Sequence, residues 1–282
     1  MSARLLDGRA LATELRDDLH RRVERLASES AGPPRLAILG DGASEAAALY
    51  AASLGRAASR VGIHTELRLG GEEPIEGVIE RLNADPTVAG IVIAQPFANA
   101  AEGRRLVQHV DPAKDVDGAT PTNAGWLARG EPAFVPATAL AVIALLEAYQ
   151  VPIAGRRTVI VGRSAVVGRP VASLLLARDA TVVVCHRATR DLVRETREAE
   201  LLVVATGVPS LIGPDMVSPS ATVVDCGINA VDGGIVGDVD TAAVAAVVAA
   251  ISPVPGGVGP VTPMMVLRQT VEAAERASRS SA

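Results

Sequence analysis

The sequence predicts an α/β fold with two domains, and three observations lead to it. Short runs rich in Val and Ile alternate with longer segments of helical spacing in both halves of the chain, which is typical of parallel strands with crossover helices. Between the halves, residues 95–134 are rich in Pro, Gly, Asp, Asn and Thr, so we expect a cleft between the two domains there. The 282 residues, 49% of them hydrophobic, suffice for two buried cores.

The first half is predicted to contain three strands, at residues 35–40, 64–69 and 88–94. Helices with apolar residues at helical spacing are expected between and after them, at residues 43–61, 74–83 and 101–110. Each strand is a short run rich in β-branched or alternating residues, which separates it from the longer helical segments.

The second half repeats the alternation. Its predicted strands lie at residues 157–161, 180–185, 201–206 and 221–225. Its predicted helices lie at residues 138–149, 167–178, 191–199 and 262–278. We therefore expect a first domain over residues 1–138, a second over residues 139–261, and a C-terminal helix within residues 262–282 that packs back on the first domain.

Composition excludes several classes of protein. A net charge of −5 and 2% aromatic residues argue against nucleic-acid binding, which needs a basic surface and stacking rings. The longest apolar run, Ala242–Ile251, is too short to span a membrane, and charged residues at positions 4, 7 and 9 occupy the place of a signal peptide's apolar stretch. We expect a soluble, cytoplasmic protein with a small-molecule ligand.

Neither a disulfide nor a metal site is expected. Cys185 and Cys226 both lie in or beside apolar runs that are predicted strands, where a cysteine usually is a small buried hydrophobe. The four histidines have no ligand spacing with one another or with the cysteines: His20, His64, His109 and His186.

A possible phosphate site follows the strand at residues 157–161. The segment Gly162-Arg163-Ser164-Ala165-Val166-Val167-Gly168-Arg169-Pro170 would place a glycine turn at the start of a helix, where free N–H groups point at an anion. Ser164 replaces the middle glycine of the usual motif, and Gly168 comes one residue late. A plain structural turn is therefore the alternative.

The next strand decides between the two nicotinamide dinucleotides. Where an NAD enzyme has an acidic residue for the ribose hydroxyls, this chain has Cys185-His186-Arg187. A cation there suits a 2′-phosphate, and Arg163 can add a second charge. The pattern favours NADP over NAD; the alternative is that both arginines are solvated surface residues.

Ordered motifs along the whole chain resemble the methylenetetrahydrofolate dehydrogenase/cyclohydrolase family. They are Leu6-Asp7-Gly8, Pro112-Ala113-Lys114-Asp115-Val116-Asp117-Gly118, Pro121-Thr122-Asn123, the glycine segment above, Asp225-Cys226-Gly227-Ile228-Asn229, Gly237-Asp238-Val239 and Pro253-Val254-Pro255-Gly256-Gly257-Val258-Gly259-Pro260. The resemblance implies two α/β domains, the C-terminal one a Rossmann-type NADP-binding domain, and a homodimer that binds a reduced folate opposite NADP.

The resemblance also implies roles for particular residues. Asp117 would bind the amino-pyrimidine edge of the pterin, since one carboxylate accepts two N–H donors side by side, and Tyr50 would pack against the ring. The loop residues Pro255, Gly256, Gly257 and Gly259 would line the substrate site. The dinucleotide contacts would be Gly162, Arg163, Ser164, Gly168, His186, Arg187 and Ile228. Asp115 competes with Asp117 for the pterin, and Asp117 could instead only form a turn.

Departures from the family pattern concentrate where the chemistry is expected. The family's catalytic lysine, one helical turn after the tyrosine, is Leu54 here, which we expect to contact the substrate instead. The family's glutamine falls on Ala94, with Gln95 one step away on the opposite face. Lys114 is the alternative base, but against it stands that the family has a lysine in that loop besides its catalytic lysine.

We therefore predict an NADP-dependent 5,10-methylenetetrahydrofolate dehydrogenase without effective cyclohydrolase activity, with Tyr50 and Asp117 in the catalytic site. Hydride transfer mainly needs alignment, whereas hydrolysis of the methenyl product needs a positioned acid or base. Two alternatives stay open: an enzyme of the same scaffold with a different substrate, and a non-catalytic NADP-binding homologue.

Overall fold

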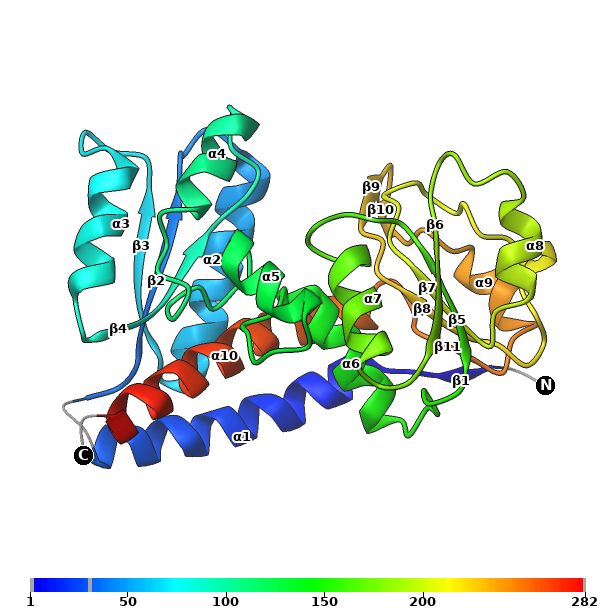
Figure 1. Cartoon of the computed structure of the whole chain (residues 1–282), viewed down its shortest axis with the longest axis horizontal. Coiled ribbons are helices and arrows are strands. Elements are labelled where there is room, and N and C mark those ends of the chain that lie inside the picture. Colours follow the sequence, from blue (N-terminus) through cyan, green and yellow to red (C-terminus); the bar gives the residue numbers. More distant parts are fainter. Residues whose placement is uncertain (1–2, 30–31, 281–282) are drawn as a thin grey trace. The chain divides into compact units, whose positions relative to one another are not determined.

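The computed structural model describes residues 3–29 and 32–280, which form two compact units (Figure 1). Unit 1 comprises the described residues up to Ala12 and Pro136–Thr262, and unit 2 comprises Thr13–Val135 and the described residues from Pro263 onward. The division falls inside two long helices, α1 (Gly8–Glu29) and α10 (Val258–Ser280). The expected α/β fold with two domains is confirmed.

Unit 1 is built on a parallel sheet of six strands. In chain order they are β1 (Arg4–Leu5), β5 (Arg157–Val161), β6 (Thr181–Cys185), β7 (Leu201–Val204), β8 (Thr222–Asp225) and β11 (Ala250–Ile251). Their order across the sheet is β1-β11-β8-β7-β5-β6, and all neighbours are parallel. Successive strands are added on one side of β5 up to β6 and on its other side from β7 onward, so the strand order reverses at β5. Ligands of such sheets bind beyond the carboxyl ends of the strands at this reversal point.

The remaining elements of unit 1 are short. They are α6 (Ala137–Ala148), α7 (Gly168–Leu176), α8 (Leu192–Arg197), the 3-10 turn η1 (Pro214–Met216), the antiparallel hairpin of β9 (Asn229–Val231) and β10 (Gly234–Val236), and α9 (Thr241–Ala245). The buried core contains Val159, Val161, Leu202, Val204 and Val223 of the central strands. β-branched side chains fit such a sheet, which is buried on both faces.

Unit 2 contains a parallel sheet of three strands, β2 (Arg35–Gly40), β3 (His64–Leu69) and β4 (Val88–Ile93), in the order β3-β2-β4. Its helices besides α1 and α10 are α2 (Glu45–Val61), α3 (Ile75–Ala84), α4 (Ala100–Val107) and α5 (Pro121–Ala128). Within this unit α1 and α10 run side by side, joined by a two-bond ion pair from Arg22 to Glu275 at 3.1 and 2.9 Å (Figure 1).

The first described residues do not belong to the domain predicted for residues 1–138. Arg4 and Leu5 of β1 pair with Ala250 and Ile251 of β11, so this segment belongs to unit 1. The sequence pattern does not show this, because a two-residue strand has no measurable periodicity. The structure also contains two helices that the sequence pattern does not predict: α1, and α5 within the expected loop region.

The apolar run Ala242–Ile251 is divided between α9 and β11. Among the described residues, no helix is long and apolar enough to cross a membrane.

Candidate functional site

Helix α2 carries Tyr50. Ser44 caps the helix, since its Oγ accepts a hydrogen bond from the Ala47 amide at 3.2 Å. The side of α2 that faces the core contains Ala47, Ala51, Leu54, Ala58 and Val61. Leu54 is completely buried, and its contact with a substrate stays a prediction. The hydrophobic effect favours this burial, because it removes an alkyl side chain from water.

Tyr50 and Asp117 lie close enough to interact. Tyr50 is half-buried, and this burial, followed by the negative charge of Asp117, raises the pKa of the phenol above its ordinary value. Asp117 is half-exposed. The phenol therefore keeps its proton at neutral pH and can donate a hydrogen bond, while the carboxylate can accept one or two.

Lys114, in the same loop, has a structural role. Its ammonium group donates to the carbonyls of Leu82, Asn83 and Asp85 at 2.9, 2.7 and 2.6 Å, at and just beyond the C-terminal end of α3. An ammonium group has three N–H donors, so all three are used. Burial lowers the pKa of Lys114, yet its bonds to these carbonyls leave it no part as a substitute base.

Asp115 is used by the protein as well. Its carboxylate is buried and accepts hydrogen bonds from the amides of Ala119 and Thr120 at 3.0 and 2.8 Å and from Asn123 Nδ2 at 2.8 Å. Burial raises the pKa of Asp115, and these bonds act against the rise. Both oxygens are occupied. Of the two candidates for the pterin, Asp115 is therefore committed to the loop, and Asp117 is the half-exposed one.

The strand end with Ala94 and Gln95 agrees with the expected alternation of faces. Ala94 is completely buried. Gln95 is exposed and lies against α4, where a Cβ on Gly103 would be 2.9 Å from Gln95 Nε2. The buried Ala94 and the exposed Gln95 therefore face different surroundings, as the alternation predicts.

In unit 1, a close turn follows β5. Gly162 has φ +124°, and a Cβ there would lie 2.1 Å from the Ala205 carbonyl oxygen, so only glycine fits. A Cβ on Gly168 would lie 2.2 Å from the Gly162 carbonyl oxygen, which brings the start of α7 directly onto the turn. Ser164 Oγ accepts from the Val167 amide at 3.1 Å. This turn and helix start lie at the reversal point of the sheet, where a dinucleotide's phosphates bind.

Three arginines lie beyond the ends of β5 and β6. Val161 and Cys185 are register partners at the ends of these strands, so Arg163 and Arg187 each follow by two residues, and Arg190 closes the second turn. All three are exposed, and no side-chain hydrogen bond or ion pair joins their guanidinium groups to any described residue. His186 Nδ1 accepts from the Ala188 amide at 3.2 Å, so in the neutral ring Nε2 carries the proton.

Two carboxylates, Asp225 and Asp238, are completely buried in unit 1, and the sequence motifs alone predict no role for them. Asp225 accepts from the amides of Gly227, Asp238 and Val239 at 2.8, 3.1 and 3.0 Å. Asp238 accepts from the Thr206 and Gly207 amides at 2.5 and 2.9 Å and from Asn229 Nδ2 at 2.8 Å.

Asp225 and Asp238 bond to Gly227 and Asn229, the two neighbours of Ile228, and so hold this segment in place. Ile228 itself is 67% exposed. A signal was present in the sequence, because an aspartate that ends a Val-rich run is unusual for a buried strand.

The glycine loop 255–259 is tied to the start of α1 within unit 1. The Gly8 amide donates to the Gly256 carbonyl at 2.8 Å, and a Cβ on Gly8 would lie 1.7 Å from the Gly257 carbonyl oxygen. The two glycine motifs at opposite ends of the sequence therefore meet. Their roles toward a substrate stay a prediction.

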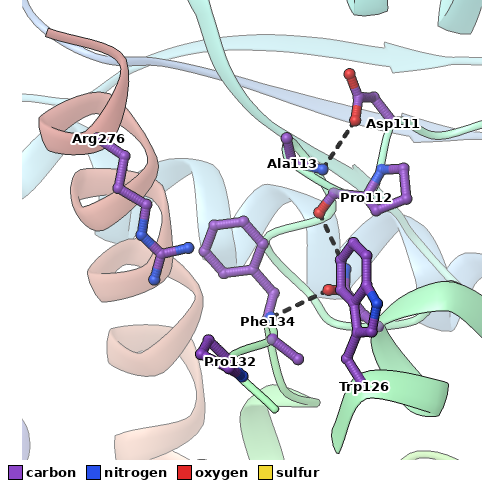
Figure 2. Close-up of a pocket in the computed structure, with 9 residues that line it drawn as sticks. Asp111, Pro112, Ala113, Trp126, Pro132, Phe134 and Arg276 are labelled. Carbon is purple, nitrogen blue, oxygen red and sulfur yellow. Dashed lines mark hydrogen bonds between the residues drawn. The ribbon is translucent and has the colours of Figure 1, made fainter. Parts of the chain in front are cut away.

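A cavity of about 290 Å³ lies elsewhere in unit 2. Trp126, Phe134, Pro112, Pro132 and Arg276 surround it (Figure 2). Asn123 donates to the Pro112 carbonyl and accepts from the Phe134 amide, and the Arg276 guanidinium lies 4.9 Å from the centre of the Phe134 ring. None of the predicted site residues lines this cavity.

A six-stranded parallel sheet with a glycine turn at its reversal point defines an α/β protein that binds a dinucleotide. Sequence comparison agrees: the model of the tetrahydrofolate dehydrogenase/cyclohydrolase NAD(P)-binding domain matches residues 136–278, and that of the catalytic domain matches residues 6–117. The chain belongs to the tetrahydrofolate dehydrogenase/cyclohydrolase family, as the ordered motifs predicted.

Individual relatives cover almost the whole chain. Bifunctional protein FolD 1 of Frankia casuarinae is 45% identical, over 97% of this chain and 100% of its own. The crystal structure of the bifunctional FolD methylenetetrahydrofolate dehydrogenase/cyclohydrolase of Campylobacter jejuni superposes with a TM-score of 0.94 at 38% identity, covering 98% of this chain and 99% of its own.

The methylenetetrahydrofolate dehydrogenase-cyclohydrolase of Trypanosoma brucei, determined with NADP and an inhibitor, has a TM-score of 0.92 at 33% identity and covers 99% of each chain.

Proposed function

We propose that this enzyme of the bifunctional dehydrogenase/cyclohydrolase family is an NADP-dependent 5,10-methylenetetrahydrofolate dehydrogenase. The observation that carries the proposal is the turn of Gly162 and Gly168 at the reversal point of the sheet, next to three guanidinium groups without partners among the described residues. Three like charges repel one another, and a 2′-phosphate removes that cost. The Trypanosoma brucei relative was determined with NADP, which supports the same choice.

The residues present fit the dinucleotide. The amides at the start of α7 would hold the diphosphate, since a side chain at Gly162 or Gly168 would fill the space that the turn needs. Arg163 and Arg187 would hold the 2′-phosphate, and Ile228 would cover an apolar face of the cofactor. When bound, the oxidised nicotinamide would supply the acceptor for a hydride from the substrate's methylene bridge.

Asp117 and Tyr50 are the proposed folate contacts. The carboxylate of Asp117 would accept two N–H bonds from the amino-pyrimidine edge, which orients the ring. The protonated Tyr50 phenol would lie against the pterin and donate a hydrogen bond to it. Orientation of the methylene carbon is the main requirement of the hydride step, so this pair and the bound dinucleotide suffice for the dehydrogenase reaction.

We further propose that the cyclohydrolase activity is weak or lost. The names of the relatives carry both activities, and this speaks for a bifunctional enzyme. Against it stand three side chains: Leu54 and Ala94 are buried and cannot ionise, and Lys114 is bonded to three carbonyls. A positioned acid or base commonly contributes about 10²- to 10⁴-fold to such a step.

A coupled absorbance assay tests both parts. With NADP and methylenetetrahydrofolate, the reduced nicotinamide and the methenyl product should form together, and the methenyl product should accumulate. Fast conversion to 10-formyltetrahydrofolate would contradict the loss of cyclohydrolase activity. No hydride transfer from any reduced folate, with NADP still bound, would favour the different substrate or the non-catalytic role. The homodimer stays a prediction for sedimentation analysis.

Leu54→Lys is the informative variant. A lysine at this position would have a lowered pKa, because burial disfavours its charge, and would supply the missing base. We expect the cyclohydrolase rate to rise at least about tenfold, at a lower melting temperature. Leu54→Met, which conserves volume, should change neither activity. No gain in the lysine variant, with the fold retained, would show that position 54 is not what limits hydrolysis.

A further inference from the structure

Gln269 of α10 is completely committed to hydrogen bonds within unit 2. Its side chain is only 3% exposed. Oε1 accepts from the Val135 amide at 2.9 Å, and Nε2 donates to the Val135 carbonyl at 2.9 Å and to the Val116 carbonyl at 2.8 Å. Both N–H donors and the oxygen are therefore used.

The two bonds to Val135 fix the orientation of the amide. Because Oε1 must face the Val135 N–H group, Nε2 must lie on the other side, and its second N–H is directed at the Val116 carbonyl. Only a side-chain amide combines these donors and this acceptor, and asparagine carries it on a shorter stem. A carboxylate would place oxygen against two carbonyl oxygens, and an alkyl group would leave three buried backbone groups without partners.

The Val116 carbonyl and the Asp117 amide belong to one planar peptide unit. A hydrogen bond that fixes the carbonyl therefore fixes the plane from which Asp117 begins. The residues before it are held as well: Val116 packs against β4, where a Cβ on Gly90 would lie 2.7 Å from Val116 Cγ1, and Asp115 accepts three hydrogen bonds. Gln269 adds a hydrogen bond to the peptide unit that precedes the Asp117 side chain, from a position 153 residues away in the sequence.

We propose that Gln269 is a positioning residue for folate binding: it sets the orientation of the Val116–Asp117 peptide and thereby aims the Asp117 carboxylate at the pterin. The inference rests on the proposed function of Asp117. It assigns Gln269 no contact with the substrate or with NADP, whose proposed ligands lie in unit 1.

The test compares Gln269→Leu and Gln269→Glu with the wild type and with matched changes at Gln108. Gln108 is an exposed residue of unit 2 whose amide donates to the Arg104 carbonyl. At saturating NADP, both Gln269 variants should raise the KM for methylenetetrahydrofolate at least about tenfold. Their kcat should stay within about threefold, and the Kd of NADPH, measured by its fluorescence, should stay within about twofold. Gln108→Leu and Gln108→Glu should change none of these values.

A pH series separates positioning from a general loss of stability. The carboxyl group of Gln269→Glu is buried, so its pKa rises, and the protonated form can again donate to one carbonyl. The ratio of its KM to that of the wild type should therefore fall as the pH is lowered from about 8 to 5.5, while the ratio for Gln269→Leu stays constant. Should Gln269→Leu not fold, Gln269→Asn, which keeps the amide on a shorter stem, replaces it.

The inference is wrong if folded Gln269 variants keep the wild-type KM, or if NADPH binding and kcat fall together with folate binding. Failure of the proposed function looks different: the wild-type enzyme itself would not oxidise methylenetetrahydrofolate, and Asp117→Ala would leave folate binding unchanged. In that case the role of Gln269 falls with it.

Discussion

At the scale of single residues, the loop Lys114-Asp115-Val116-Asp117-Gly118 shows how identical chemistry acquires different roles. Asp115 and Asp117 are two positions apart, yet the first is buried under three hydrogen bonds and the second is half-exposed beside Tyr50. Lys114 is bonded to the carbonyls at the end of α3. Burial and three hydrogen bonds commit Asp115 to the loop, whereas Asp117 stays half-exposed.

The first prediction concerns the Tyr50–Asp117 pair. The chain has two tyrosines, so Tyr149→Phe leaves Tyr50 as the single phenol in an ultraviolet titration. Its pKa should lie above the ordinary value. Adding Asp117→Asn should lower that pKa but leave it raised, because burial is the larger cause. Asp17→Asn, on the exposed part of α1, is the control; an unchanged pKa in the Asp117 variant would show that the two groups do not interact.

The second prediction concerns cofactor choice. Arg163→Ala and Arg187→Ala should each lower kcat/KM for NADP by about 10- to 100-fold, because each guanidinium would make a charge-assisted bond to the 2′-phosphate. Activity with NAD should change little. The ratio of kcat/KM with NADP to kcat/KM with NAD, from steady-state kinetics, measures this change in cofactor preference. Arg178→Ala is a suitable control, since Arg178 already pairs with Glu147 at 2.8 Å. Equal losses with both cofactors would place these arginines elsewhere than at the 2′-phosphate.

At the scale of elements, the turn between β5 and α7 shows why its glycines are needed. The pattern departs from the usual dinucleotide motif in spacing and in the serine, yet the backbone makes the same close approach: Gly162 lies against Ala205, and Gly168 lies against Gly162. The serine hydroxyl accepts from the Val167 amide and so orders the longer loop. Such a turn requires room for two backbone segments to approach each other, and glycines at other sequence spacings can provide that room.

The third prediction follows from that space. Gly168→Ala puts a methyl group 2.2 Å from the Gly162 carbonyl oxygen, so the turn must shift. NADP affinity should fall at least about tenfold and the protein should lose about 1–3 kcal/mol of stability. Gly125→Ala is the matched control: nothing lies within 4 Å of a Cβ there in helix α5, so that variant should gain about 0.5–1 kcal/mol. Calorimetry and NADPH titration measure both.

At the scale of the whole molecule, stability should depend on pH through a buried acid. Burial is the largest cause that raises the pKa of Asp225 to about 6, and the three amide bonds act against it. A folded-state pKa above the unfolded value of 3.8 means that the folded protein binds this proton more tightly. The contribution of Asp225 therefore favours folding most below about pH 4, and it is lost as the pH rises through about 6.

The fourth prediction isolates this contribution. The difference in free energy of unfolding between the wild type and Asp225→Asn should shift in favour of the wild type by on the order of 2 kcal/mol as the pH falls from 7 to 4. Paired carboxylates such as Glu275, whose pKa Arg22 lowers, act in the opposite direction but are present in both proteins and cancel. Asp232→Asn, at an exposed turn, should show no such trend in urea titrations at each pH.

The sequence by itself determined the two-domain α/β fold, most of its strands and helices, and the dinucleotide turn, because these depend on local periodicity and on glycines that only one conformation requires. Only the tertiary structure assigned β1 to unit 1, buried Leu54, separated Asp117 from Asp115, and brought Gln269 to the Val116 carbonyl. Each of these depends on contacts between residues far apart in the sequence, and periodicity carries no information about such partners.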